Sequence, residues 1–385
     1  MQSSEPEPAA SSGISRSRKL IFASVVVCCA FALLEGTARL VTGTANGSRF
    51  DQINQIVMFL GTHESDLMLE YDSERFWKLK PSVTINDPDN IFWQGTVSNS
   101  LGFRSEEFAP TKKPGTFRIV CFGDSSTFGI GNPIKDTWPS QLQELLNSRF
   151  PDEQIQFQVI NAGVPGYTSF QGLQHMRQEL DRLSPDLVMA SYANNDFWHW
   201  DKQTDRQHAE RLAQSSPIHD TLMNSRLVQL MAAGLSSLRD KKVTQAPGPN
   251  QHWTKAASLN YAKPRPDWIR RVPLDSFRAN ITSMADLCGS RGIAMIPVKW
   301  PDQPQAGGRW SPRIEYQEVL DEIATDRQLA VADVVSLFQQ NRDWAVRTYI
   351  PNDIVHVNRD GNRLAAQAAY SAVSRVLMSR MLSTN

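Results

Sequence analysis

Four short polar segments of the sequence hold the side chains best suited to chemistry. They are FGDSSTFG at residues 122–129, NAGVPG at 161–166, ANND at 193–196 and DIVH at 353–356. Ser125 offers a hydroxyl group, and His356 offers a base that works near neutral pH. Asp353 lies three residues before His356, close enough on one turn to hold the imidazole Nδ1–H. Together they predict nucleophilic acyl transfer, in which a base activates a hydroxyl and a carboxylate orients that base.

Acyl transfer also needs hydrogen-bond donors around the oxygen atom that becomes negatively charged. The candidates for this oxyanion hole are the backbone N–H groups of Ser125 and Gly163 and the side-chain amide of Asn195. Asn194 precedes Asn195 directly, so the doublet leaves two amides for one role.

Two further carboxylates, Asp124 and Asp196, lie beside these candidates and are expected to be structural. Asp124 is placed to accept hydrogen bonds from nearby backbone N–H groups. The four cysteines show no CxxC spacing and no Cys/His pattern typical of a metal site. We therefore expect neither a metal ion nor an organic cofactor.

The segments FGDSSTFG, NAGVPGYTS, YANND and DIVHVNRDGNRLA resemble, in order, the four blocks of the SGNH (GDSL-type) esterases and acylhydrolases. The resemblance covers roughly residues 116–195 and 275–380. It implies Ser125 as nucleophile, Asp353 and His356 as the rest of a triad, and an oxyanion hole with Gly163 and Asn195. Asn195 is favoured because it precedes the aspartate, as in the family. The sequence departs from the family at Ala193, where the family usually has glycine. The departure matters because alanine adopts positive φ with difficulty.

Apolar runs alternate with helical patterns from residue 117 onward, which predicts an α/β fold. The expected strands cover residues 117–122, 157–160, 187–192, 293–298 and 329–334. We expect a flavodoxin-like three-layer sandwich with a five-stranded parallel sheet in the order 2-1-3-4-5. In that order the ends of the first and third strands flank the switch point where ligands bind, and Ser125 and Asn195 follow these ends.

The N-terminus predicts a membrane anchor. Arg16, Arg18 and Lys19 precede an apolar run, so we expect a cytoplasmic tail at 1–19, a transmembrane segment at 20–42 and a periplasmic remainder. A cleaved signal peptide and a buried soluble helix are the alternatives. NSLGFRSEEF, together with such an anchor, resembles a membrane-tethered bacterial branch of the family.

The rest of the chain is expected to divide into a small strand-rich extension and a hydrolase domain. The extension covers residues 43–115, and the domain covers 116–385 with an insertion at 197–274. A helix is expected near residues 221–238 of the insertion. Arg271 is expected to form a surface salt bridge, with an anionic substrate as the alternative.

The overall charge is balanced, with 40 Lys and Arg against 40 Asp and Glu, which argues against a general nucleic-acid binder. We expect a serine esterase or acylhydrolase that acts on O-acyl esters, on envelope glycans or lipids, through an acyl-enzyme. An O-acetyltransferase that modifies an envelope polysaccharide would use the same acyl-enzyme and is an alternative. A non-catalytic binding or scaffold protein on the same fold is a second alternative.

Overall fold

The computed structural model describes residues 15–42, 68–85, 95–150, 155–214, 225, 227–228, 231 and 269–383. Contacts divide the chain into two compact units. The helical unit, named after its described helix at residues 16–42, comprises residues 1–49 with 216–243, and the α/β unit comprises residues 50–215 with 244–385. Almost all of the helix expected near 221–238 lies outside the described residues.

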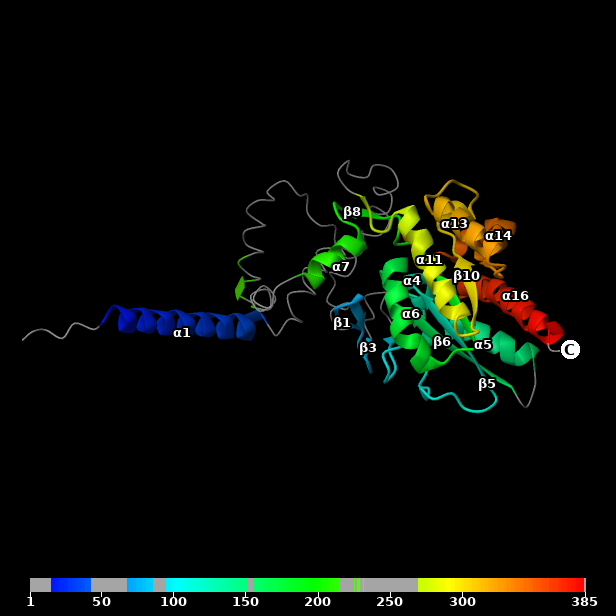
Figure 1. The fold of residues 1–385 in the computed structure, drawn as a ribbon. Coiled ribbons are helices and arrows are strands. Elements are labelled where there is room, and N and C mark those ends of the chain that lie inside the picture. The colour runs from blue at the N-terminus through cyan, green and yellow to red at the C-terminus, as the bar shows by residue number, and fades with distance from the viewer. Residues whose placement is uncertain are drawn as a thin grey trace, which may run out of the picture. The chain divides into compact units, whose positions relative to one another are not determined.

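The centre of the α/β unit is a five-stranded parallel sheet (Figure 1). Its strands are β5 (Thr116–Gly123), β6 (Gln156–Gly163), β7 (Leu187–Ser191), β10 (Ala294–Lys299) and β11 (Ala332–Asp333). The order β11-β10-β7-β5-β6 is the expected 2-1-3-4-5 arrangement, which is confirmed. Gly123 pairs with Gly163 on one side and with Ser191 on the other, so three strands end together at one edge.

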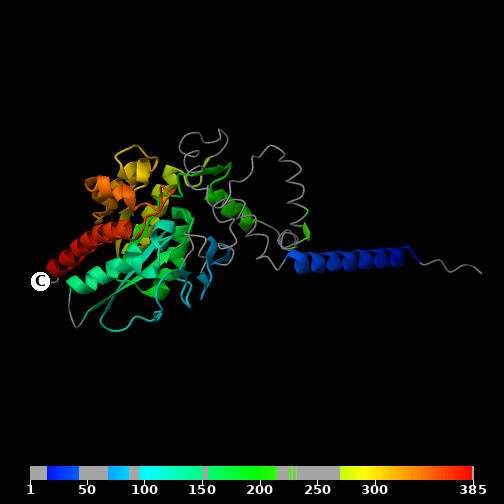
Figure 2. The ribbon, with the colours of Figure 1, turned by 180° about the vertical axis from the view of Figure 1, so that it is seen from behind.

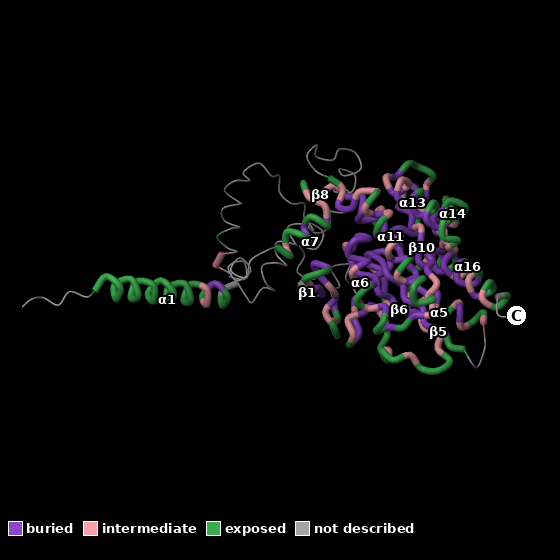
Figure 3. The backbone as a smooth tube through the Cα atoms, viewed as in Figure 1, coloured by how far each residue is buried: buried purple, intermediate pink, exposed green. Residues whose placement is uncertain are grey.

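Helices cover both faces of the sheet. On β5, Val120 and Phe122 belong to one hydrophobic core while Ile119 and Cys121 belong to the other. This alternation explains why the strand is apolar throughout: both of its faces are buried. The backbone tube is accordingly buried through the centre of the unit (Figure 3). The three-layer sandwich expected from the sequence is confirmed.

One layer holds α6 (Ser169–Leu183), α11 (Leu274–Gly289) and α13 (Arg313–Asp326). The other holds α5 (Trp138–Arg149), α14 (Val334–Gln340) and α16 (Arg359–Ser383). The helices α5 and α16 lie side by side, as Figures 1 and 2 show from opposite directions. Short helices join these elements: α4 (Ser125–Phe128), η1 (Ile134–Asp136), α12 (Gln303–Ala306), α15 (Arg342–Ala345) and η2 (Val346–Thr348).

The last strand is shorter than the expected 329–334, since β11 contains only Ala332 and Asp333. The Asp333 side chain accepts a hydrogen bond of 2.9 Å from the Ser336 backbone N–H and so caps α14. As the N-cap residue of α14, Asp333 ends the strand. Val334 and Val335 therefore lie in the helix, although valine favours strands.

The described part of the extension consists of two small antiparallel pairs. The strand β1 (Leu69–Asp72) pairs with β2 (Phe76–Leu79), and β3 (Thr84–Ile85) pairs with β4 (Thr96–Val97). Trp77 is fully buried; its Nε1 donates to the Pro165 carbonyl at 3.0 Å, and its own carbonyl accepts from Tyr167 at 2.5 Å. The extension is thus fixed to the loop that follows β6.

The two ends of the insertion pair with each other. The strands β8 (His199–Asp201) and β9 (Ile269–Arg270) form an antiparallel pair, and α7 (Asp205–Ala213) follows β8. The described ends of the insertion are therefore part of the α/β unit.

The helical unit contains α1 (Arg16–Thr42), which is long and apolar enough to cross a membrane. A signal sequence near an N-terminus meets the same criteria of length and composition. Near its end, Glu35 pairs with Arg39 at 2.6 Å and accepts a hydrogen bond from the Ser225 hydroxyl at 2.8 Å.

Candidate active site

Ser125 occupies a tight turn from β5 into α4. Asp124 caps α4, because its Oδ1 accepts a hydrogen bond of 2.8 Å from the Ser126 backbone N–H. Ser125 is the first residue of the helix, and Gly129 ends the helix at φ 81°, a conformation that glycine adopts without strain. Asp124 therefore fixes the start of the turn that carries Ser125.

The structure brings together the three side chains predicted for acyl transfer. His356 Nε2 lies 2.7 Å from Ser125 Oγ, and His356 Nδ1 lies 2.6 Å from Asp353 Oδ2. The other Asp353 oxygen accepts backbone N–H bonds from Val355 at 2.7 Å and from His356 at 3.1 Å. In a neutral imidazole, Nδ1–H then donates to the carboxylate and Nε2 accepts from the serine hydroxyl.

The surroundings of Asp353 favour its ionised form. Burial acts to raise the pKa of Asp353, but the charge of His356 and the hydrogen bonds from residues 355 and 356 outweigh it. The pKa therefore lies below its ordinary value. Asp124 shows the opposite balance: burial raises its pKa despite the hydrogen bond from Ser126 and the positive charge of Arg313.

Gly163 lies beside the strand end that carries Ser125, but its backbone N–H is already used. It donates a hydrogen bond of 3.0 Å to the Asn161 Oδ1 atom. The residue must be glycine for a packing reason, since a Cβ atom there would lie 2.3 Å from the Phe128 backbone nitrogen. By contrast, the Ser125 backbone N–H donates to no described residue.

The two asparagines of the third segment have different partners. Asn195 Nδ2 donates a hydrogen bond of 2.9 Å to the Tyr167 carbonyl, which leaves its second amide hydrogen for another acceptor. Asn194 Oδ1 accepts a hydrogen bond from Arg313 Nη2. Arg313 is almost fully buried and also donates to the Trp300 carbonyl at 3.3 Å.

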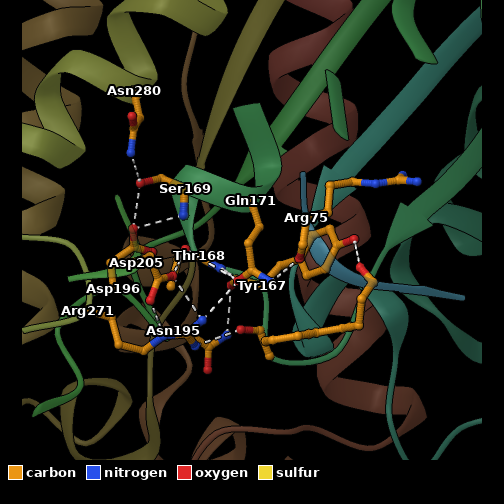
Figure 4. Close-up of polar contacts among 12 residues, drawn as sticks. Arg75, Tyr167, Thr168, Ser169, Gln171, Asn195, Asp196, Asp205, Arg271 and Asn280 are labelled. Atoms are coloured by element: carbon orange, nitrogen blue, oxygen red, sulfur yellow. Dashed lines mark hydrogen bonds and ion pairs between the residues drawn. The ribbon is translucent and has the colours of Figure 1, made fainter. Parts of the chain in front are cut away.

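Asp196 joins the third segment to the start of α6 (Figure 4). Its Oδ1 accepts hydrogen bonds from the backbone N–H and the hydroxyl of Ser169 at 2.9 and 2.6 Å, and its Oδ2 accepts from the Ala193 N–H at 3.1 Å. Burial raises the pKa of Asp196 to about 7, although these hydrogen bonds oppose the shift. Ala193 adopts φ 107°, the unfavourable region anticipated for an alanine in place of glycine.

The expectation that Arg271 forms a surface salt bridge is wrong. Arg271 is buried and pairs with the buried Asp205 at 3.0 Å (Figure 4). It also donates to the Gly166 carbonyl at 2.8 Å and to Gln171 Oε1 at 2.9 Å. The pair therefore ties both ends of the insertion to the loop after β6.

Sequence reasoning missed three residues that hold the candidate site together. Asn161 Nδ2 donates to the Thr127 carbonyl of α4 at 2.8 Å. Asn132 Nδ2 donates to the carbonyl of Val357, next to His356, at 2.8 Å. The third is Arg313, described above. Asn161 opens the NAGVPG segment, which was a usable signal, but nothing local marks the other two.

The described residues offer no metal site, since among them no group of three or more His, Cys, Asp or Glu side chains is placed to hold an ion. At the carboxyl edge of the parallel sheet, a serine, a histidine and an aspartate lie in contact. This is the construction of a serine hydrolase. A family model, described as the GDSL-like lipase/acylhydrolase family, matches residues 121–364. The match covers more than half of the chain, so the chain belongs to this family. The family and the enzyme class expected from the sequence are therefore confirmed.

An arylesterase of Vibrio mimicus is 35% identical over 79 residues, a match that covers 20% of this chain and 38% of the relative. Similar solved structures include LAE5, an α/β hydrolase from the metagenome of Lake Arreo, at 16% identity and a TM-score of 0.41. It aligns with 67% of this chain and 94% of its own. A variant of the acetyl xylan esterase Axe2 from Geobacillus stearothermophilus aligns at 17% identity and a TM-score of 0.42, over 66% and 94% of the two chains. A lipase/acylhydrolase from Enterococcus faecalis aligns at 19% identity and 0.39, over 66% and 93%.

Proposed function

We propose that this chain is a serine esterase that hydrolyses O-acyl esters through an acyl-enzyme. Ser125 is the nucleophile, His356 is the general base, and Asp353 orients and stabilises the imidazole. The observation that carries the proposal is the unbroken contact from Ser125 Oγ through both His356 nitrogens to Asp353, at 2.7 and 2.6 Å.

In the first half-reaction His356 Nε2 takes the Ser125 proton while Oγ attacks the ester carbonyl carbon. The tetrahedral intermediate collapses when the imidazolium returns that proton to the leaving alkoxide, which departs as an alcohol. Water then attacks the acyl-serine, with its proton passing to the same nitrogen, and the acid and free Ser125 are released.

The developing oxyanion needs donors that are not already bonded elsewhere. The first two are the Ser125 N–H, which donates to no described residue, and the second amide hydrogen of Asn195. The Gly163 N–H joins them only if it leaves Asn161 Oδ1, its present acceptor. One such donor typically contributes about 2.7–4 kcal/mol of barrier stabilisation.

The proposed substrates are acylated glycans or lipids of the cell envelope. The support is α1, which with the basic residues Arg16, Arg18 and Lys19 has the features of an anchor that leaves the remainder outside the cytoplasm. The division into a tail at 1–19, an anchor at 20–42, an extension at 43–115 and a hydrolase domain at 116–385 is part of this proposal. Membrane fractionation and a C-terminal periplasmic reporter test it, and a soluble, processed chain would contradict the anchor.

The catalytic proposal is tested with the full chain, p-nitrophenyl acetate and a fluorophosphonate probe. Ser125→Ala should abolish both turnover and labelling. Ser126→Ala is the matched control, because the buried Ser126 hydroxyl has no hydrogen-bond partner among the described residues. Wild-type turnover in Ser125→Ala would refute the assignment.

Product analysis separates hydrolysis from acyl transfer. With a glycan acceptor present, an esterase releases free acetate from p-nitrophenyl acetate. Acetylation of the glycan in place of acetate release would replace the proposal with the O-acetyltransferase alternative. Absence of probe labelling in the wild type would support the non-catalytic alternative.

A further inference from the structure

A hollow of about 350 Å³ lies between the extension and α6. Its walls come from the β1–β2 region, from the turn at residues 100–103 and from one side of α6. The residues of the proposed triad are not among those that line it. Its volume is at the lower end of the range for small-molecule sites, about 300–1,000 Å³, so it fits one small ligand unit.

The charged side chains of the hollow are arranged in pairs of opposite sign. Lys78 lies 3.3 Å from Glu70, and Arg182 lies 2.6 Å from Glu179. The third cation, Arg75, pairs with Asp72 at 2.9 Å. An anion in the hollow would meet carboxylates, and a cation would meet basic groups. A ligand whose groups both donate and accept hydrogen bonds, as hydroxyls do, matches both.

Two of the lining residues each hold one buried polar atom that has no hydrogen-bond partner among the described residues: His175 Nδ1 and Arg75 Nε. Burial, followed by the charge of Arg75, lowers the pKa of His175 well below its ordinary value, so its ring is neutral. A neutral imidazole offers one donor and one acceptor. The Arg75 side chain extends away from the buried network that its carbonyl joins (Figure 4).

The hollow also offers apolar surface. Leu79, Pro81, Leu101 and Phe103 contribute to its lining. The Phe103 ring stacks on the His175 ring, with 6.2 Å between the two ring centroids. The Arg182 guanidinium lies over the Phe103 ring, 5.4 Å from its centroid. Apolar walls beside paired donors and acceptors suit a ligand that has both C–H faces and hydroxyl groups.

We propose that this hollow is a binding site for an uncharged saccharide unit, separate from the ester-cleaving site. Val164 links the two places, since it lines the hollow, follows Gly163 directly and donates a backbone hydrogen bond of 3.0 Å to the Gly123 carbonyl. The hollow thus holds a sugar of a glycan chain next to the loop that borders Ser125. Binding of the sugar does not depend on the proposed esterase activity.

The test measures binding by the full chain in detergent with Ser125→Ala, so that no ester is turned over. Xylotetraose and N-acetylchitotetraose are the neutral probes, and inorganic phosphate is the anionic one, all titrated by calorimetry. At least one oligosaccharide should bind saturably. Glu179→Gln and Leu101→Trp should each weaken that binding at least tenfold, the first by removing an acceptor and the second by filling the space.

Arg177→Ala is the matched control, because Arg177 lies on the same helix, is exposed and does not line the hollow. It should leave binding unchanged, and equal melting temperatures should show that the variants are folded. With Ser125 restored, Glu179→Gln should hydrolyse p-nitrophenyl acetate at the wild-type rate, so loss of sugar binding is separable from failure of the esterase proposal.

Three outcomes would overturn the inference. One is that neither oligosaccharide binds in the millimolar range. Another is that phosphate binds saturably while the oligosaccharides do not, which would make this an anion site. The third is that Leu101→Trp and Glu179→Gln bind the oligosaccharide as tightly as the control, which would place the sugar elsewhere on the protein.

Discussion

Arg104 Nη2 donates a hydrogen bond of 2.7 Å to the carbonyl oxygen of Asn132. Arg104 belongs to the extension and is fully buried, with its guanidinium 4.9 Å from the ring centre of Phe128 in α4. Asn132 in turn donates to the carbonyl of Val357, the neighbour of His356. One buried cation therefore joins the extension to both segments that bring Ser125 and His356 together.

Replacing Arg104 by methionine should lower kcat for p-nitrophenyl acetate at least tenfold while KM changes little. The methionine keeps the bulk of the side chain but leaves the carbonyls of Asn132 and Val97 without their donor. A buried acceptor left unpaired costs about 1–3 kcal/mol, which urea unfolding would measure. Lys113→Met, at an exposed position of the same segment, is the control. An unchanged kcat would show that the extension does not position the site.

Asp353→Asn should lower kcat on the order of 10³- to 10⁴-fold, with KM nearly unchanged. The amide no longer fixes the imidazole with Nδ1 protonated, nor does it stabilise the imidazolium. Steady-state kinetics on an aryl ester measures the effect. Asp360→Asn, close by at the start of α16, should behave like the wild type. Activity within tenfold of the wild type in Asp353→Asn would remove Asp353 from the proposed triad.

Ala193→Gly should stabilise the protein by about 1 kcal/mol. The strain of a non-glycine residue at φ 107° costs about 1–3 kcal/mol, which glycine would remove. The greater conformational entropy of glycine in the unfolded chain lowers the free energy of unfolding by up to about 1 kcal/mol. The same exchange at Ala190 inside β7, where φ is not positive, should destabilise. Chemical denaturation measures both variants, and a less stable Ala193→Gly would show that the conformation is not strained.

Asp196 should make the folded protein less stable as the pH rises from about 4 to 7. Its pKa is about 7 in the folded chain, against about 3.9 in an unfolded one. Between these values the folded state keeps a proton that the unfolded state has lost, so the free energy of unfolding falls with rising pH, by at most about 1.4 kcal/mol per pH unit. The pKa of Asp353 is lowered in the folded chain. Asp353 therefore changes the free energy of unfolding only below about pH 4, where its protonation destabilises the fold.

Urea unfolding between about pH 5 and 7 measures this slope. Asp196→Asn should have a smaller slope than the wild type, whatever its absolute stability. Equal slopes would show that Asp196 is already ionised in the folded chain over this range.

Patterns within short stretches of sequence were sufficient for much of the fold. The apolar run at residues 117–122 predicted β5, and the alternation of apolar runs with helical patterns predicted the strand order. The last strand was overestimated because the apolar residues around Asp333 suit a strand or a helix, and the capping of α14 by Asp333 ends the strand there.

Contacts between distant residues could not be predicted in the same way. Arg313 lies 119 residues from its partner Asn194. Arg271 lies 66 residues from Asp205, so its burial could not be recognised from its neighbours. Likewise, a glycine in the second segment gave no sign that its N–H group would be bonded to Asn161.

The pairing of β8 with β9 and the Arg271–Asp205 ion pair hold the two ends of the insertion together. A segment whose ends are paired in this way can be exchanged for another without disturbing the α/β unit that carries it. The chain therefore has a place where inserted sequence can be accepted at little cost to the folding of the sheet and helices that carry Ser125 and His356.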